Sequence, residues 1–371
     1  MVLHFFKKRI ACDSYCRTVV PTVCKIGPAS PVKQLGQLFY KGCFDQLNNN
    51  YFMAQPELHF VISAPRSGST WLTNALNEHP DIFATEHRLF GDFCEIWNDN
   101  NGSSSPRITF DKYAKSFSVH YFFEKMGMDR QQFLDVFQRS FANFLVSFAQ
   151  NRTNKRIVVD KITPYPGTSA MVVERIRKLF PDSKIVQLVR DGRDVLTSGT
   201  YDWLLKDAHG SQRYAYFVEK RPIVLKRFFD DAVIEKWANN WKETIDAFQI
   251  PADANISFEA MKSDLAGQLK TVFQTVGTTD AAADNAAAIA AVEATGFKGV
   301  TGRSEGDSSS PTAKARKGVA GDWKLHFTRR DGLLFHDIAG ETLIKMKYET
   351  DDSWISQLPE ELEMDENNST R

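Results

Sequence analysis

The residues best suited to chemistry lie in the turn 65–71, which reads Pro-Arg-Ser-Gly-Ser-Thr-Trp. Successive backbone N–H groups at the start of a following helix would form an anion site there. Gly68 would let a phosphate approach the backbone, and Arg66 adds a positive charge. A tight strand-to-helix connection without a ligand is the alternative, and the turn by itself does not decide between the two.

Basic residues gather in two further segments of the chain. One reads Arg-Asp-Gly-Arg-Asp-Val-Leu-Thr-Ser and runs from Arg190 to Ser198. The other contains Arg316 and Lys317 and follows a stretch rich in Gly, Ser and Pro. Basic clusters this far from the turn predict a ligand that carries anionic groups at both ends.

The turn differs from the phosphate loop of nucleoside triphosphatases. The Gly-x4-Gly-Lys-Ser/Thr spacing is absent, and no acidic pair suggests a magnesium site. Metal-dependent phosphoryl transfer therefore fits poorly, and we expect no metal. A P-loop kinase or nucleotide hydrolase stays as one alternative, and a non-catalytic nucleotide-binding protein stays as another.

Taken together, the three segments resemble the sulfotransferases that use 3′-phosphoadenosine 5′-phosphosulfate (PAPS). The turn from Pro65 looks like their 5′-phosphosulfate loop, and the segment from Arg190 looks like their 3′-phosphate segment. Residues 316–328 are similar to the cytosolic signature Arg-Lys-Gly-x-x-Gly-Asp-Trp-Lys-x-x-Phe-Thr. The resemblance covers roughly residues 58–348.

This resemblance implies PAPS as the sulfuryl donor and 3′-phosphoadenosine 5′-phosphate (PAP) as the product. Many relatives carry Lys where Arg66 stands, and a forked guanidinium can bridge phosphate and sulfonate oxygens. Trp71 and Phe258 would stack on adenine. The implied donor-binding residues are Arg66, Ser67, Gly68, Ser69, Thr70, Trp71, Arg190, Ser198, Phe258, Arg316, Lys317 and Gly318.

The acceptor hydroxyl needs a base, and the sequence offers Glu86 and His87. In the Golgi-type branches of the family the base is a glutamate at about the distance that separates Glu86 from Arg66, so the resemblance favours Glu86. It implies an in-line transfer in which Glu86 takes the proton while Arg66 stabilises the leaving phosphate.

Lys161 is a further catalytic candidate. Asp160-Lys161 with Thr163-Pro164 resembles the Glu-Lys-Ser-Pro segment of heparan sulfotransferases, but one residue is inserted here. The insertion leaves the catalytic role of Lys161 open.

Apolar runs separated by amphipathic runs must position these residues. Strands are predicted at 58–64, from 81, and at 156–161, 184–189 and 255–259, and helices are predicted at 71–76, 171–180, 232–248, 265–276, 280–295 and 329–347. This alternation predicts an α/β fold: a P-loop-like three-layer sandwich with a mostly parallel central sheet covered by helices on both faces. Ligands would bind at the carboxyl ends of the strands.

The acceptor cannot be read from the sequence. Aromatic residues recur at helical spacing from 113 to 150, and helix packing explains most of them better than the wall of an acceptor pocket does. With the segment 201–229 they would shape a pocket that fits a sugar, a phenol, a sterol or a lipid. The expected partner is a hydroxyl-bearing small molecule or glycan, and the resemblance of residues 324–328 adds a homodimer contact.

Composition argues against nucleic-acid binding, a membrane span and a zinc site. The 371 residues carry 46 Lys and Arg against 46 Asp and Glu, so no net field favours nucleic acid. No apolar run reaches the ~20 residues that cross a bilayer, and a cytoplasmic location is expected. Four of the five cysteines, Cys12, Cys16, Cys24 and Cys43, lack paired metal-ligand spacing, so free thiols are favoured over zinc.

Three parts of the chain are predicted. Residues 1–55 form an N-terminal arm, residues 56–348 form the sulfotransferase domain, and residues 349–371 form an acidic tail that is expected to be disordered.

Overall fold

The computed structural model describes residues 57–86, 125–127, 130–206, 226–248, 251–302, 304–306 and 317–363. The chain divides into two compact units, Met1–Gln55 and Pro56–Arg371, and all of the described residues belong to the second. The predicted arm with its cysteines, His87 and Arg316 lie outside the described residues.

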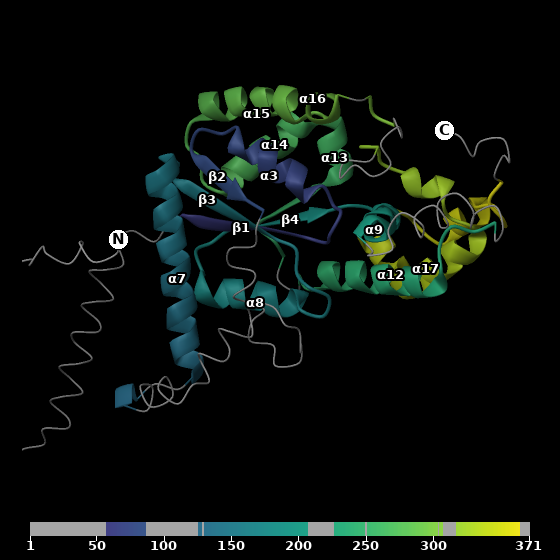
Figure 1. Cartoon of the computed structure of the whole chain (residues 1–371), viewed down its shortest axis with the longest axis horizontal. Coiled ribbons are helices and arrows are strands. Elements are labelled where there is room, and N and C mark those ends of the chain that lie inside the picture. The colour runs from purple at the N-terminus through teal and green to yellow at the C-terminus, as the bar shows by residue number, and fades with distance from the viewer. Residues whose placement is uncertain are drawn as a thin grey trace, which may run out of the picture. The chain divides into compact units, whose positions relative to one another are not determined.

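In the described part of the chain, one five-stranded sheet forms the centre of the fold, with the strand order β2-β3-β1-β4-β5 (Figure 1). Every neighbouring pair is parallel, which confirms the predicted sheet. β1 is buried along its whole length, as expected for a strand covered on both faces. The strands are β1 (Leu58–Ser63), β2 (Ile82–Thr85), β3 (Ile157–Ile162), β4 (Ile185–Val189) and β5 (Ala254–Ser257).

Helices cover both faces of the sheet (Figure 1). α3, α14 and α15 pack on one face and α7 and α8 on the other, while α9, α12 and α17 build a third core cluster beside β4. The helices are α3 (Ser69–Asn77), α7 (Arg130–Thr153), α8 (Ser169–Leu179), α9 (Gly192–Lys206), α12 (Asp231–Asp246), α13 (Phe258–Ser263), α14 (Leu265–Thr275), α15 (Ala281–Thr295), α16 (Phe297–Thr301) and α17 (Arg329–Lys345), with the 3-10 helices η2 (Asp322–Leu325) and η3 (Ser353–Gln357).

The charged segment after β4 contains the start of a helix. α9 begins at Gly192. The carboxylate of Asp191 accepts a hydrogen bond from the backbone N–H of Arg193 at 2.9 Å, which satisfies one amide of the first helical turn.

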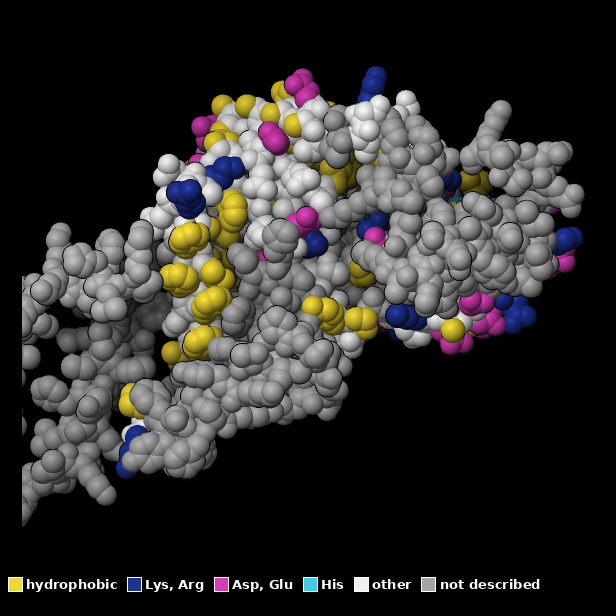
Figure 2. All heavy atoms as spheres, in the orientation of Figure 1, with side chains coloured by type: hydrophobic (Ala, Val, Ile, Leu, Met, Phe, Trp, Pro, Cys, Tyr) yellow, Lys and Arg dark blue, Asp and Glu magenta, His cyan; other side chains and the backbone are white. Residues whose placement is uncertain are grey.

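α7 packs on the sheet through small residues, and several of its large aromatic side chains point outward. Ala142, Val146 and Ala149 are buried, whereas Phe144 and Phe148 are 62% and 63% exposed. Figure 2 shows apolar side chains gathered along this helix. Helix packing therefore does not account for Phe144 and Phe148.

The expectation of a disordered tail is wrong for its first part. Residues 349–363 contain η3, and Trp354 and Leu358 are buried in the cluster formed with α17. The carbonyl of Pro359 accepts a hydrogen bond from the backbone N–H of Arg329. Apolar residues placed between the acids give this segment enough surface to bury, and residues 364–371 lie outside the described part.

Within the described ranges, no helix combines the length and apolarity needed to cross a membrane.

Candidate functional site

Five of the predicted site residues lie along one edge of the sheet. Because the strands are parallel, their carboxyl ends lie along the same edge. Following the strand order, this edge carries Glu86 after β2, Lys161 near the end of β3, Arg66 after β1, Arg190 after β4 and Phe258 after β5. Residues that are far apart in the sequence are thus brought to a common site.

The turn 65–71 has the geometry of an anion cradle. Gly68 adopts a positive φ of 86° immediately before α3, and no side chain of the described residues caps this end of the helix. Ser67 is fully buried, and its Oγ has no hydrogen-bond partner in the described part of the chain. A buried hydroxyl beside uncapped helix amides favours an anionic ligand at this position.

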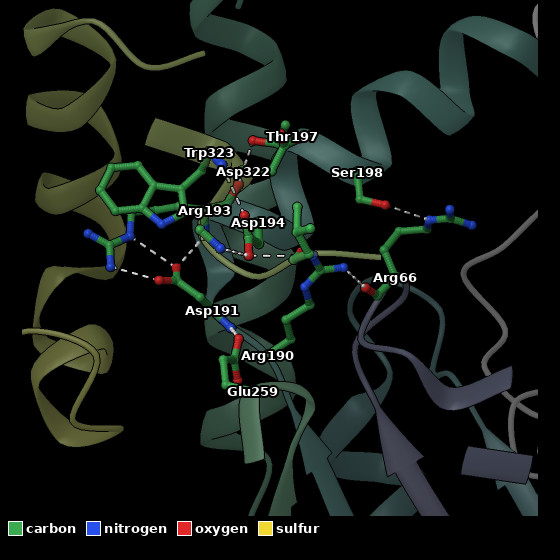
Figure 3. Close-up of polar contacts among 12 residues, drawn as sticks. Arg66, Arg190, Asp191, Arg193, Asp194, Thr197, Ser198, Glu259, Asp322 and Trp323 are labelled. Carbon is green, nitrogen blue, oxygen red and sulfur yellow. Dashed lines mark hydrogen bonds and ion pairs between the residues drawn. The ribbon is translucent and has the colours of Figure 1, made fainter. Parts of the chain in front are cut away.

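Arg66 connects the turn to α9. Its Nε donates to Ser198 Oγ at 3.2 Å (Figure 3), and its Nη1 lies 3.3 Å from Asp202 Oδ1. Its carbonyl accepts a hydrogen bond from Arg190 Nη1 at 3.1 Å. Both ends of this residue are therefore held by residues that follow β4.

Arg190 lies at the centre of the site (Figure 3). Besides the carbonyl of Arg66, its guanidinium donates to the carbonyl of Val319 at 3.0 Å, and it lies 4.1 Å from the centre of the Phe258 ring. Asp194, whose Oδ2 is 3.4 Å from Arg190 Nη2, balances the largely buried charge. One side chain thus joins the turn, the segment from 317 and the start of α13.

Asp194 holds the segment from 317 in place, a role the sequence analysis did not predict. Its carboxylate accepts hydrogen bonds from the backbone N–H groups of Gly321 at 2.8 Å and Trp323 at 3.0 Å. Burial raises the pKa of Asp194, while Arg190 opposes this shift. The one sequence feature that could have indicated this role is the position of Asp194 within the basic segment that begins at Arg190.

Trp71 and Phe258, the two residues predicted to stack on adenine, lie against each other and are here called the aromatic wall. Their ring centres are 5.9 Å apart in an edge-to-face arrangement. The indole Nε1 of Trp71 donates to Thr295 Oγ1 at 3.1 Å, and Lys262 Nζ lies 5.7 Å from the centre of the indole ring. Thr295 and Lys262 are additions to the site, and no sequence motif marks either of them.

The predicted 3′-phosphate residues Lys317 and Gly318 begin the segment 317–323, next to Phe297 of α16. Lys317 Nζ pairs with Asp322 Oδ1 at 2.9 Å. Gly318 has a φ of 66°, and a Cβ there would lie 2.3 Å from the Phe297 ring. Only glycine fits this position, so the segment 317–323 passes close to α16.

The acceptor side of the site is less fully defined. Glu86 is half-buried directly after β2. The register pairs Thr85 with Asp160, which puts Glu86 beside the strand end that carries Lys161. Lys161 Nζ donates to Thr163 Oγ1 at 3.5 Å. Because His87 lies outside the described residues, the choice of base stays a prediction.

One family model matches the chain. The model of the Sulfotransferase family matches residues 59–281, more than half of the sequence. No curated protein has a significant match.

Several solved structures match the chain at low sequence identity and low TM-score. Mouse sulfotransferase SULT7A1 complexed with PAP is 15% identical, with 83% of this chain and 90% of that chain covered and a TM-score of 0.42. The sulfotransferase domain of the Synechococcus PCC 7002 olefin synthase is 17% identical, with 78% and 96% covered and a TM-score of 0.40. Sulfotransferase STF9 from Mycobacterium avium is 11% identical, with 82% and 80% covered and a TM-score of 0.42. None of these likenesses is close enough to indicate a ligand of this chain.

Proposed function

The chain belongs to the sulfotransferase family, and on this premise we propose that it transfers the sulfuryl group of PAPS to a hydroxyl of an acceptor. PAP would be the second product. The role of each residue below is part of this proposal.

The observation that carries the proposal is the position of Arg190. Its guanidinium contacts the carbonyl of Arg66, the carbonyl of Val319 and the ring of Phe258. These contacts join the three places where a nucleotide with phosphates at both ends would be held. A 5′-phosphosulfate would lie on the turn 65–71, adenine on the aromatic wall and a 3′-phosphate on the segment from 317.

The residues present suit such a donor. The buried Oγ of Ser67, without a partner among the described residues, and the uncapped start of α3 offer donors to the 5′ end. At the other end, Ser198 and Lys317 supply a hydroxyl and an ammonium to the 3′-phosphate. Arg190 adds charge between the two ends.

The transfer would follow an in-line path. The acceptor oxygen attacks the sulfur of PAPS, the new S–O bond forms on the side opposite the phosphate, and the bond from sulfur to the bridging oxygen breaks. Glu86 accepts the hydroxyl proton, and the electron pair of the broken bond stays on the phosphate of PAP. Arg66 and the turn amides stabilise the charge that develops on the bridging oxygen.

Arg66 is engaged before the donor binds. Its guanidinium is held by Ser198 and Asp202 at 3.2 and 3.3 Å, so the sulfonate of PAPS would compete with Asp202 for this cation. Arginine suits the exchange because its several N–H groups allow it to hold one partner while it binds another.

Labelled PAPS offers the direct test. The full chain would be incubated with PAPS carrying labelled sulfur and with a panel of sugar, phenol, sterol and lipid acceptors, with and without magnesium. We expect label transfer to at least one hydroxyl class, with PAP released in equal amount. If no acceptor is labelled and ATP with magnesium displaces PAP in a thermal-shift assay, the proposal is wrong and a P-loop kinase or hydrolase is favoured.

A further inference from the structure

A network of largely buried charged residues extends from the donor site to Glu349, after α17. Arg193 on α9 is only 2% exposed. Its Nε and Nη2 donate to the two carboxylate oxygens of Asp191 at 3.0 and 2.7 Å, and its Nη1 donates to Glu349 Oε1 at 2.6 Å. Burial lowers the pKa of Arg193, but these two carboxylates outweigh it and hold the pKa above its usual value. Glu349 thus completes the pairing of a cation that the fold buries.

Arg193 also contacts two tryptophan rings. Its guanidinium carbon lies 3.8 Å from the ring centre of Trp323 and 4.5 Å from that of Trp354. The two rings meet edge to face, with centres 5.5 Å apart. Trp323 belongs to η2, directly beyond the predicted 3′-phosphate residues, and Trp354 belongs to η3. One guanidinium therefore joins η2 to the C-terminal segment.

A second link runs through Glu259, which directly follows Phe258 of the aromatic wall. Glu259 Oε1 accepts the backbone N–H of Asp191 at 3.0 Å, and Glu259 Oε2 accepts the hydroxyl of Tyr348 at 3.1 Å. Figure 3 shows Glu259 and Asp191 next to each other, beside Arg190. Residues 348 and 349 thus reach two elements of the donor site.

The segment 348–358 is itself firmly packed. Trp354 and Leu358 are buried. A Cβ on Gly332 of α17 would lie 2.7 Å from Leu358 Cδ1, so the two elements are in close contact. Packing against α17 thus fixes the position of the segment 348–358.

We propose that residues 348–358, here called the C-terminal brace, position the 3′-phosphate segment of the donor site through Arg193 and Trp323. This inference rests on the function proposed above. The brace residues act as positioning residues, because they reach the site through Arg193 and Glu259.

The brace should act on one end of the donor more than on the other. Asp194 holds the backbone of Gly321 and Trp323, while the guanidinium of Arg193 lies 3.8 Å from the ring centre of Trp323. Loss of Trp354 would release that ring and let residues 317–323 shift. Among the described residues, no hydrogen bond or ring contact joins Trp323 directly to the turn 65–71, so binding of a 5′-phosphate should be largely spared.

Calorimetry with two nucleotides separates these effects. The full chain would be titrated with PAP and with adenosine 5′-phosphate, which lacks the 3′-phosphate. For Trp354→Ala we expect the Kd for PAP to rise about tenfold, which is a loss of about 1.4 kcal/mol of binding free energy. The Kd for adenosine 5′-phosphate should stay within about twofold of the wild-type value. Trp354→Phe, which keeps an aromatic face, should recover most of the affinity for PAP.

Two further variants distinguish a specific effect on PAP binding from a general loss of stability. Glu349→Gln keeps the size and shape of the side chain but removes the negative charge that pairs with Arg193. It should raise the Kd for PAP and leave the Kd for adenosine 5′-phosphate unchanged. Val173→Ala on α8 removes buried volume in a different core cluster. It should lower the melting temperature without changing the ratio of the two affinities.

Three results would overturn the inference. The first is a PAP-to-adenosine 5′-phosphate ratio that stays at the wild-type value in Trp354→Ala and Glu349→Gln. The second is an equal loss of both affinities, as a merely structural role predicts. The third is a wild-type chain without preference for PAP, which would contradict the proposed function as well.

Discussion

At the scale of single residues, Arg66 combines a disfavoured backbone with fixed contacts. Its φ of 65° lies in the left-handed region, which costs a residue with a Cβ ~1 kcal/mol. Hydrogen bonds to its carbonyl and its guanidinium hold this conformation. A cation that the fold orients in advance can stabilise developing charge without further reorganisation.

Replacing Arg66 by alanine should lower kcat by about a hundredfold or more, as the loss of an oxyanion donor does. Arg66→Lys, which keeps the charge but loses the fork, should retain part of the activity. Steady-state kinetics with PAPS and the identified acceptor would measure both. Turnover near the wild-type value in Arg66→Ala would remove this residue from the mechanism.

Glu86→Gln should separate binding from chemistry. The amide keeps the shape of the side chain but cannot take a proton, so PAP affinity and melting temperature should stay at wild-type values while transfer falls by about a hundredfold or more. Calorimetry and single-turnover kinetics would show the two effects. Persistent transfer would point to His87 or another group as the base.

At the scale of elements, the junction between β1 and α3 depends on Gly68. The residue has a φ of 86°, and a Cβ there would come within 2.6 Å of Phe258 Cδ2. The turn and the aromatic wall are therefore packed directly against each other. A side chain at this point would disturb the 5′ end and the adenine face together.

Gly68→Ala should weaken PAP and adenosine 5′-phosphate alike, each by about tenfold or more. Gly277→Ala is the matched control, because Gly277 has a φ of 85° and no neighbour within 4 Å of its added Cβ. Both variants should lose about 1 kcal/mol of stability from the strained backbone, measured by thermal unfolding. Nucleotide affinity should fall only in Gly68→Ala, and an equal fall in both would contradict the direct packing of turn and wall.

At the scale of the whole molecule, acid should destabilise the fold through His59 on β1. Burial lowers the pKa of His59 from 6.5 to about 4, and its Nδ1 accepts the backbone N–H of Lys184 at 3.0 Å. Between pH 6.5 and 4 the unfolded chain binds the proton and the folded chain does not. The stability linked to His59 is therefore complete above pH 6.5 and is lost as the pH falls to 4.

Urea unfolding at several pH values would measure this contribution. We expect the free energy of unfolding of the wild type to lose ~3 kcal/mol between pH 7 and pH 4 through His59. In His59→Gln, whose amide oxygen can accept the same N–H, this part of the pH dependence should vanish. Equal slopes for the two proteins would show that another group titrates.

Local patterns were sufficient for much of this molecule. Short β-branched runs and helical periodicity were sufficient to predict five strands and most helices, because these features depend on neighbours along the chain. The same patterns were insufficient for Phe144 and Phe148 and for the segment 349–363. Periodicity marks an apolar face but does not say whether a partner covers it.

What only the tertiary structure decided is how the distant segments meet. The strand order places β4 beside β1, and this brings Arg190 to the carbonyl of Arg66. Asp194, Arg193 and Glu349 have their roles because buried charges need partners, and those partners lie elsewhere in the sequence. The sequence by itself thus predicted which residues would hold a doubly anionic nucleotide, while the parallel sheet and its buried ion pairs decided which backbone segments these residues join.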